Sequence, residues 1–237
     1  MTYWALSRRP KYSLLFALPL LVLYELLALA LSGGAMAGVR NGADVLLKSL
    51  FLTFGGRTGL IVFGALLLGT GGWLVWRDRR SGGSMRWPVF GGMAIESLVY
   101  ASVLGLVTAT LTSLLLGGTL PFAVGQFAGL GLASQVMISL GAGLYEELLF
   151  RVVMVGALAW LARRVLGSPL AAGAVATLVG ALVFSAFHYI GPYGDRLELG
   201  SFAFRAVAGL LFSTLYLLRG FGIAAWTHAL YDLLLVG

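Results

Sequence analysis

Residues 135–160 read QVMISLGAGLYEELLFRVVMVGALAW, an almost wholly apolar run that carries Glu146, Glu147 and Arg151. A helix needs about 20 apolar residues to cross a bilayer, so this run predicts a transmembrane span. Ionisable groups within hydrocarbon are costly, and their presence there is by default a hypothesis of function. On a helix Glu147 and Arg151 lie one turn apart on the same face and can pair. Glu146 points about 100° away from Glu147 and is free to face another helix.

The composition of the whole chain indicates an integral membrane protein. Hydrophobic residues make up 59% of the 237 residues, charged residues only 11%, and the mean hydropathy is +0.95. Such a balance excludes an ordinary soluble domain. The chain has no cysteine, which excludes disulfides, a thiol nucleophile and a thiolate metal site. The net charge of +7 is accounted for by basic loops and calls for no nucleic-acid partner.

The hydropathy pattern predicts an all-α polytopic membrane protein with about seven transmembrane helices in a single domain, residues 1–237. The first apolar run is about as long as a membrane is thick and more runs follow it, so it is predicted to be a retained span and not a cleaved signal peptide. Residues 1–133 would supply N-terminal spans, and residues 134–237 a four-helix catalytic core. The predicted spans are residues 12–31, 59–76, 88–116, 134–161, 171–190, 201–218 and 221–236.

Three further segments complete this prediction. Residues 44–54, with apolar groups around Lys48, suit a helix lying in the membrane interface, and one long tilted span through them is the alternative. Residues 33–41 are predicted to be a loop. Residues 117–131 carry no charge and are predicted to be a loop or a re-entrant segment.

The basic residues predict the orientation. With alternating spans, ten Lys and Arg residues fall on the side of the N-terminus and four on the other side. The richer side is expected to be cytoplasmic, which places the C-terminus outside and suits the inner membrane of a bacterium. The ten are Arg8, Arg9, Lys11, Arg77, Arg79, Arg80, Arg86, Arg163, Arg164 and Arg219; the four are Arg40, Lys48, Arg57 and Arg196.

Both histidines of the chain lie in predicted spans. His188 has Phe184 one turn before it, where the phenyl ring can shield the imidazole from lipid. His228 has Asp232 one turn after it on the same face. The depths of Glu146, both histidines and Asp232 within their spans are similar, so we expect them to converge in one cavity. The alternative is structural: a Glu–Arg pair that locks two helices, and histidines bonded to backbone carbonyls.

Polar residues outside this set are expected to have structural roles. Glu25 in the first span and Glu96 in the third are predicted to pair with Arg205 or to line a path to the cavity. Asp195, Arg196 and Glu198 lie in a polar loop on the outer side and are predicted to be solvated.

The ordered set Glu146-Glu147-x-x-x-Arg151, Phe184-x-x-x-His188 and His228-x-x-x-Asp232 resembles the CPBP family. This family comprises the CAAX prenyl endopeptidases of the Ras-converting type and their bacterial relatives, including a bacteriocin-processing type. The resemblance covers residues 143–233, whereas the first three spans are similar only in being hydrophobic.

The resemblance implies a glutamic-type intramembrane protease. Glu146 would be the general base that activates water, assisted by His188. His228 and residue 232 would stabilise the oxyanion of the tetrahedral intermediate, because donors fixed in a low-dielectric site act strongly on developing charge. Glu147 and Arg151 would support this site.

Position 232 departs from the family pattern. The prenyl-protein proteases carry Asn there, and an ionised Asp cannot donate a hydrogen bond. Either Asp232 is held protonated by burial, or it orients His228 and leaves the donor role to the imidazole.

A metal is the second open question. No cofactor is favoured, although a zinc ion bound by Glu146, His188 and His228 is chemically reasonable. The His-Glu-x-x-His arrangement of zinc proteases is absent from the sequence, which favours the metal-free mechanism.

The expected substrate is a membrane protein or a lipidated or anchored peptide, reached from a cavity that opens toward the outer half of the bilayer. An inverted orientation would favour a cytosolic CAAX tail instead. The alternatives are a non-catalytic member of the same family, acting as a regulator or immunity protein, and a proton-coupled transporter. The sequence shows no inverted repeat, which disfavours the transporter.

Overall fold

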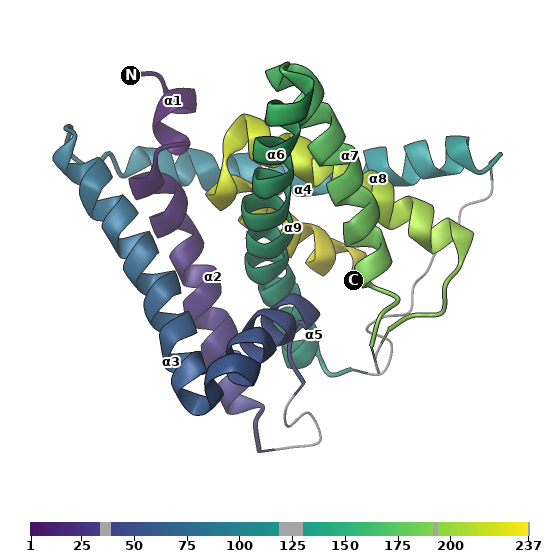
Figure 1. The fold of residues 1–237 in the computed structure, drawn as a ribbon, viewed down its shortest axis with the longest axis horizontal. Helices are drawn as coiled ribbons and strands as arrows, with labels where there is room; N and C mark the ends of the chain where they lie inside the picture. The colour runs from purple at the N-terminus through teal and green to yellow at the C-terminus, as the bar shows by residue number, and fades with distance from the viewer. Residues whose placement is uncertain (34–38, 119–129, 192–193, 237) are drawn as a thin grey trace.

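The computed structural model describes residues 1–33, 39–118, 130–191 and 194–236, and these ranges are helical without any strand. Figure 1 shows the arrangement, in which α4 crosses behind α6 and α7. The all-α polytopic prediction is confirmed. The helices are α1 (Tyr3–Ser7), α2 (Pro10–Ala30), α3 (Gly42–Arg80), α4 (Pro88–Leu115), α5 (Leu132–Gly141), η1 (Ala142–Val155), α6 (Gly156–Leu166), α7 (Pro169–Phe187), α8 (Leu199–Arg219) and α9 (Phe221–Val236).

Local sequence explains several helix ends. Proline begins α2, α4 and α7, where its missing N–H costs nothing because the first turn has no partner for it. Gly167 adopts a left-handed conformation after α6, with φ 66°, and Gly220 separates α8 from α9 with φ 83°. Both values disfavour any residue with a Cβ, so these glycines set where the chain reverses.

Five helices, α2, α3, α4, α7 and α8, are long and apolar enough to cross a membrane by length and composition. The predicted fourth span is built from three consecutive helices, α5, η1 and α6. The predicted seventh span is α9, which has 16 residues. The predicted total of seven spans stays a prediction. Most of the predicted loop at residues 117–131, and residues 34–38 of the first loop, lie outside the described residues.

The predicted helix at residues 44–54 lies in a separate arm of α3, and its place in the membrane interface stays a prediction. Gly56 has φ 54° and ψ −144°, which breaks the helix between residues 42–55 and 57–80. The two arms fold back on each other, because the rings of Phe51 and Phe63 lie 5.3 Å apart although twelve residues separate them. The alternative of one continuous tilted span is therefore wrong. Gly59 permits the fold, since a Cβ there would clash with the carbonyl oxygen of Phe51.

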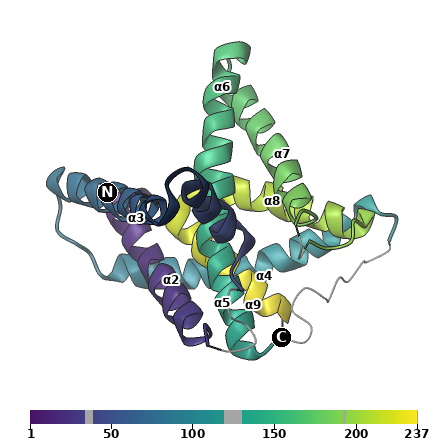
Figure 2. The same cartoon turned by 60° about the horizontal axis from the view of Figure 1, so that its bottom comes forward.

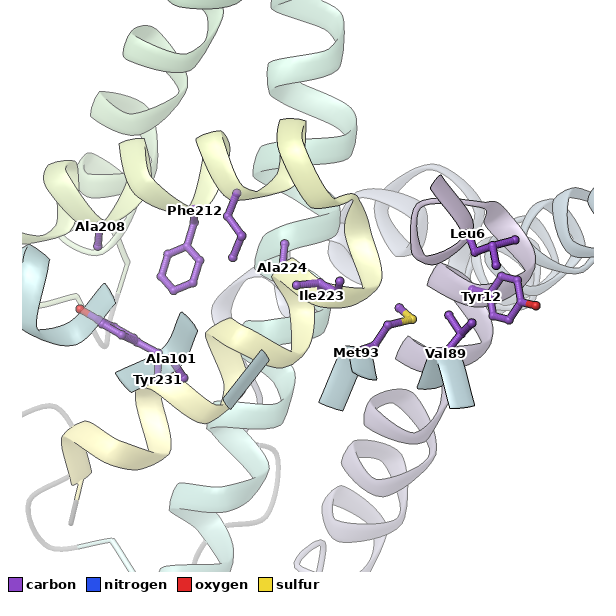
Figure 3. Packing of buried hydrophobic residues seen from close by; sticks show 11 residues of the cluster. Leu6, Tyr12, Val89, Met93, Ala101, Ala208, Phe212, Ile223, Ala224 and Tyr231 are labelled. Carbon is purple, nitrogen blue, oxygen red and sulfur yellow. The ribbon is translucent and has the colours of Figure 1, made fainter. Parts of the chain in front are cut away.

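Helices from both halves of the chain pack around α9, which contacts α2 and α4 as well as α5, η1 and α8. Figure 2 shows α9 lying against α4 and α5 from a second direction. One apolar cluster joins Phe212 and Ile223 of the C-terminal half to Met93 and Tyr12 of the N-terminal half (Figure 3). The predicted catalytic core is thus packed directly against the N-terminal spans.

Small residues allow η1 to approach α9 closely. A Cβ at Gly143 would lie 2.8 Å from the Cβ of Ala229 and would clash with the carbonyl oxygen of Ala225. Real Cβ atoms do not come this close, so only glycine fits at this crossing. The approach brings the turn after Gly143, with its two glutamates, against the turn of α9 that carries His228.

Glu25 and Glu96 do not pair with Arg205, contrary to the prediction. Glu96 binds Arg219, with Arg219 Nη2 2.7 Å from its Oε2, and Glu25 accepts from Arg40 at 3.0 Å and from Lys48 at 2.9 Å. The cations that bind Glu25 lie around the start of α3, and the cation that binds Glu96 is the last residue of α8. Arg205 instead donates to Asp195 and to Tyr189, so Asp195 is paired and not merely solvated.

Candidate active site

The two adjacent glutamates lie on a stretch of π-helix. In η1 the hydrogen bonds run from residue i+5 to residue i, as from the N–H of Gly156 to the carbonyl of Arg151. A long π-helical stretch is rare and such turns are frequent at functional sites. Glu146 is 7% exposed, and Glu147 and Arg151 are completely buried. The sequence predicted an ordinary α-helix here, because the spacing of apolar and polar residues alone does not distinguish a π-helix from an α-helix.

Glu147 links η1 to α9. Its Oε1 lies 3.2 Å from Nη1 of Arg151, as the four-residue spacing predicted, and 2.7 Å from Nδ1 of His228. A carboxylate only accepts, so Nδ1 of His228 carries the proton that it donates to Glu147. One oxygen therefore fixes both the tautomer and the orientation of the imidazole. The sequence assigned Arg151 to Glu147 but missed this second contact.

The other side of the His228 ring faces Glu146 and Asp232. Nε2 of His228 lies 4.0 Å from Oε2 of Glu146 and 3.8 Å from Oδ1 of Asp232. Both distances exceed a hydrogen bond, so Nε2 is left available for a third group placed between these carboxyls. Asp232 does not hold His228 in this structure, since Glu147 does so at Nδ1.

Aromatic rings enclose the imidazole and the guanidinium. Phe212 of α8 stacks on His228 with ring centroids 4.4 Å apart. The guanidinium carbon of Arg151 lies 4.3 Å from the ring centroid of Phe184 and 5.6 Å from that of Phe212. Such cation–π contacts gain strength when desolvated, which helps to retain the buried charge of Arg151. Phe212 was not identified from the sequence, because it carries no polar signal.

His188 is the first residue after α7 and lies beside Phe184, with ring centroids 4.9 Å apart in an edge-to-face arrangement. Its Nδ1 lies 2.9 Å from the carbonyl oxygen of Phe184. A carbonyl can only accept, so Nδ1 is the protonated nitrogen and Nε2 of the neutral ring keeps a free lone pair. Phe184 also lies 6.2 Å from His228 between ring centroids, so one phenyl ring is near both histidines. Phe184 thus lies against the imidazole as predicted, and its role in shielding the ring from lipid stays a prediction.

A contact from the N-terminal half completes the surroundings of Glu146. Nδ2 of Asn41, the residue before α3, donates to Oε1 of Glu146 at 2.8 Å. The predicted residues Glu146, Glu147, Arg151, His228 and Asp232 thus meet in one buried cluster, with His188 and Phe184 at its edge. Asn41 was missed because it is 105 residues away from Glu146 in the chain. Two surface hollows lie away from this cluster, one of them beside Glu25 and Arg40.

The suggested zinc ligands are Glu146, His188 and His228. Two ligands on a tetrahedral zinc at about 2.1 Å stand roughly 3.4 Å apart, whereas Glu146 Oε2 and His228 Nε2 are 4.0 Å apart. Within the described residues no three His, Asp or Glu side chains are grouped to hold a metal ion. As arranged, Glu146 and His228 stand farther apart than two ligands of one tetrahedral zinc.

Comparison with known proteins finds a family similarity over part of the chain. Residues 127–234 match the family model described as Rce1-like, type II CAAX prenyl endopeptidase Rce1-like. No curated protein and no solved structure matches the chain. The matched range holds α5, η1, α6, α7, α8 and most of α9, and with them every residue that the sequence assigned to the site. Residues 127–234 of this integral membrane protein are thus similar to the Rce1-like family of type II CAAX prenyl endopeptidases.

Proposed function

We propose that this protein is an intramembrane endopeptidase that uses Glu146 to activate water. The observation that carries the proposal is the meeting of Glu146 Oε2 with His228 Nε2, 4.0 Å apart in a buried cluster. At this separation a reacting group beside the two atoms can be within hydrogen-bond reach of both of them. A general base must lie within hydrogen-bond reach of the proton that it removes, directly or through a water, and Oε2 is free to do so.

The reaction would begin with a water molecule placed between Glu146 Oε2 and the free Nε2 of His188. Glu146 takes one proton from this water while the oxygen attacks the carbonyl carbon of the scissile peptide bond. The carbonyl oxygen becomes the oxyanion. The tetrahedral intermediate then collapses, the C–N bond breaks, and the proton on Glu146 passes to the leaving amine. The products are a carboxylic acid and an amine, and Glu146 is regenerated.

His228 would stabilise the oxyanion with a proton on Nε2. Its Nδ1–H is already committed to Glu147, so a proton on Nε2 gives the ring a positive charge that the Glu147 carboxylate compensates. Asp232, 3.8 Å from Nε2, would act as the second donor in its protonated form, in the place where the prenyl-protein proteases have Asn. A neutral carboxyl group can donate, whereas an ionised one cannot.

The substrate would be a membrane-associated or C-terminally anchored protein or peptide. The excess of basic residues on the side of the N-terminus supports a cytoplasmic N-terminus in a bacterial inner membrane. The end of α7, with His188, would then lie toward the outer side. This favours the membrane-proximal segment of an exported protein over a cytosolic prenylated tail.

The proposal is tested by comparing membrane proteomes of cells that lack the protein with cells that carry the wild type or Glu146→Gln. Fragments that appear only with the wild type identify the substrate and the cleaved bond. A phenotype that survives Glu146→Gln without any cleavage product would point to a non-catalytic regulator and overturn the proposal. The purified protein is then assayed on the identified substrate with and without a chelator, since inhibition that zinc reverses would replace the metal-free mechanism.

A further inference from the structure

Asn41 lies outside the range that matches the family, yet its side chain reaches the centre of the site. It is 4% exposed, and its Nδ2 donates to Oε1 of Glu146 at 2.8 Å. A hydrogen bond to a charged acceptor is stronger than one between neutral groups, and a low-dielectric setting strengthens it further. This bond therefore acts directly on the residue proposed as the base.

The direction of the Asn41 amide is fixed by its own helix. Oδ1 accepts from the N–H of Ala43 at 2.9 Å and faces the N–H of Asp44 at 3.4 Å, which makes Asn41 the cap of α3. The capping role requires an oxygen at this place, so the other end of the amide must be the NH₂ group. That group points at Glu146.

The backbone of Asn41 is held as well. Its N–H donates to the hydroxyl of Tyr24 at 3.2 Å, and that hydroxyl donates to Oδ2 of Asp44 at 2.8 Å. The helix α5 packs tightly on the same spot, because a Cβ at Gly141 would lie 2.8 Å from the Cβ of Asn41. The start of α3 is thus fixed against the helix that continues into η1.

Resting on the proposed function, we infer that Asn41 is the positioning residue of the base: it holds Oε1 of Glu146 and leaves Oε2 to face His228. The two carboxylate oxygens then have separate tasks. Oε1 is anchored by α3, and Oε2 removes the proton from water. Without the anchor the Glu146 side chain samples other orientations, and proton transfer slows while substrate binding is retained.

The test separates this role from capping. Ser and Asp are good helix caps, but Asn41→Ser is too short to reach Glu146 and Asn41→Asp presents a carboxylate to it. We expect both variants to remain folded, with kcat about ten- to a hundredfold lower and KM within about twofold of the wild type. Thr2→Ser, at the cap of α1, serves as the control and should leave kcat unchanged.

Glu146→Gln is measured beside these variants. If Glu146→Gln is inactive while Asn41→Ser retains full kcat, the positioning role is wrong and the proposed function stands. If Glu146→Gln still cleaves, the proposed function itself fails. A second measurement needs no substrate. The infrared band of the Glu146 carboxyl group is the band that disappears in Glu146→Gln. This band should shift in Asn41→Ser, because the carboxyl group of Glu146 loses a hydrogen bond there. An unshifted band would overturn the inference.

Discussion

The carboxylate of Glu147 on η1 accepts a hydrogen bond from Nδ1 of His228 on α9, at 2.7 Å. This hydrogen bond joins two helices inside the protein, although the two bonded residues are 81 positions apart in the chain. The same oxygen lies 3.2 Å from Arg151. Adjacent glutamates therefore have different tasks: Glu147 orients the imidazole, and Glu146 faces the space beyond it.

Replacing Glu147 with Ala should reduce both stability and activity. The change leaves the completely buried Arg151 without its carboxylate, and breaking a buried pair in this way costs roughly 3–5 kcal/mol. The double variant Glu147→Ala/Arg151→Leu should regain much of the lost stability because no unpaired charge is left. It should stay inactive, because His228 is still not held. Thermal unfolding in detergent and turnover measure the two effects, and a double variant with restored turnover would contradict the role of Glu147.

The close crossing of η1 and α9 predicts that Gly143→Ala is damaging. The new Cβ would meet the backbone of Ala225 and Ala229, and such overpacking costs typically 1–3 kcal/mol. Separation of the helices should also lengthen the Glu147–His228 contact and lower kcat. Gly156→Ala is the matched control, since a Cβ there meets nothing within 4 Å. Equal unfolding temperatures for the two variants would show that the crossing is looser than described.

Asp232→Asn should retain most of the activity. The amide is neutral, has the same shape and donates a hydrogen bond, which is the task assigned to a protonated Asp232. Asp232→Leu removes the donor and should lower kcat by about a hundredfold or more, as the loss of one oxyanion donor does elsewhere. Initial rates at saturating substrate compare the two. An inactive Asn variant would mean that position 232 acts through its negative charge.

Arg219 should be important for stability and unimportant for the chemical step. Its side chain is almost completely buried, bonds Glu96 of α4 and the hydroxyl of Ser7 in α1, and lies over the ring of Trp4 at 3.7 Å. Glu96→Ala leaves this cation unpaired and should lower the unfolding temperature. The kcat of the protein that remains folded should equal that of the wild type, and a specific fall in kcat would contradict this assignment.

Much of the site could be predicted from the sequence because its polar residues lie in apolar helices. Glu146, Glu147, His188, His228 and Asp232 stand out in such runs, and similar depth was enough to predict that they meet. The Glu147–Arg151 pair also followed from helix spacing. These inferences use only the period of a helix and the cost of charge in hydrocarbon.

Contacts that depend on tertiary packing could not be predicted. An Asn before a helix suggests a cap, but nothing local indicates that the NH₂ group of Asn41 reaches Glu146. The π-helical turn of η1, the fold-back of α3 at Gly56 and the pairing of Glu96 with Arg219 likewise arise from helix packing. Hydropathy distinguished the two arms of α3 but not the sharp reversal between them.

The most direct test of the central claim is the cleavage of the identified substrate in liposomes by the wild type and by Glu146→Gln. Glu198→Gln, the same substitution at an exposed position, is the control. We predict that Glu146→Gln is folded, binds the substrate and releases no product, while Glu198→Gln cleaves at the rate of the wild type. Product release by Glu146→Gln at a comparable rate would show that this glutamate is not the base.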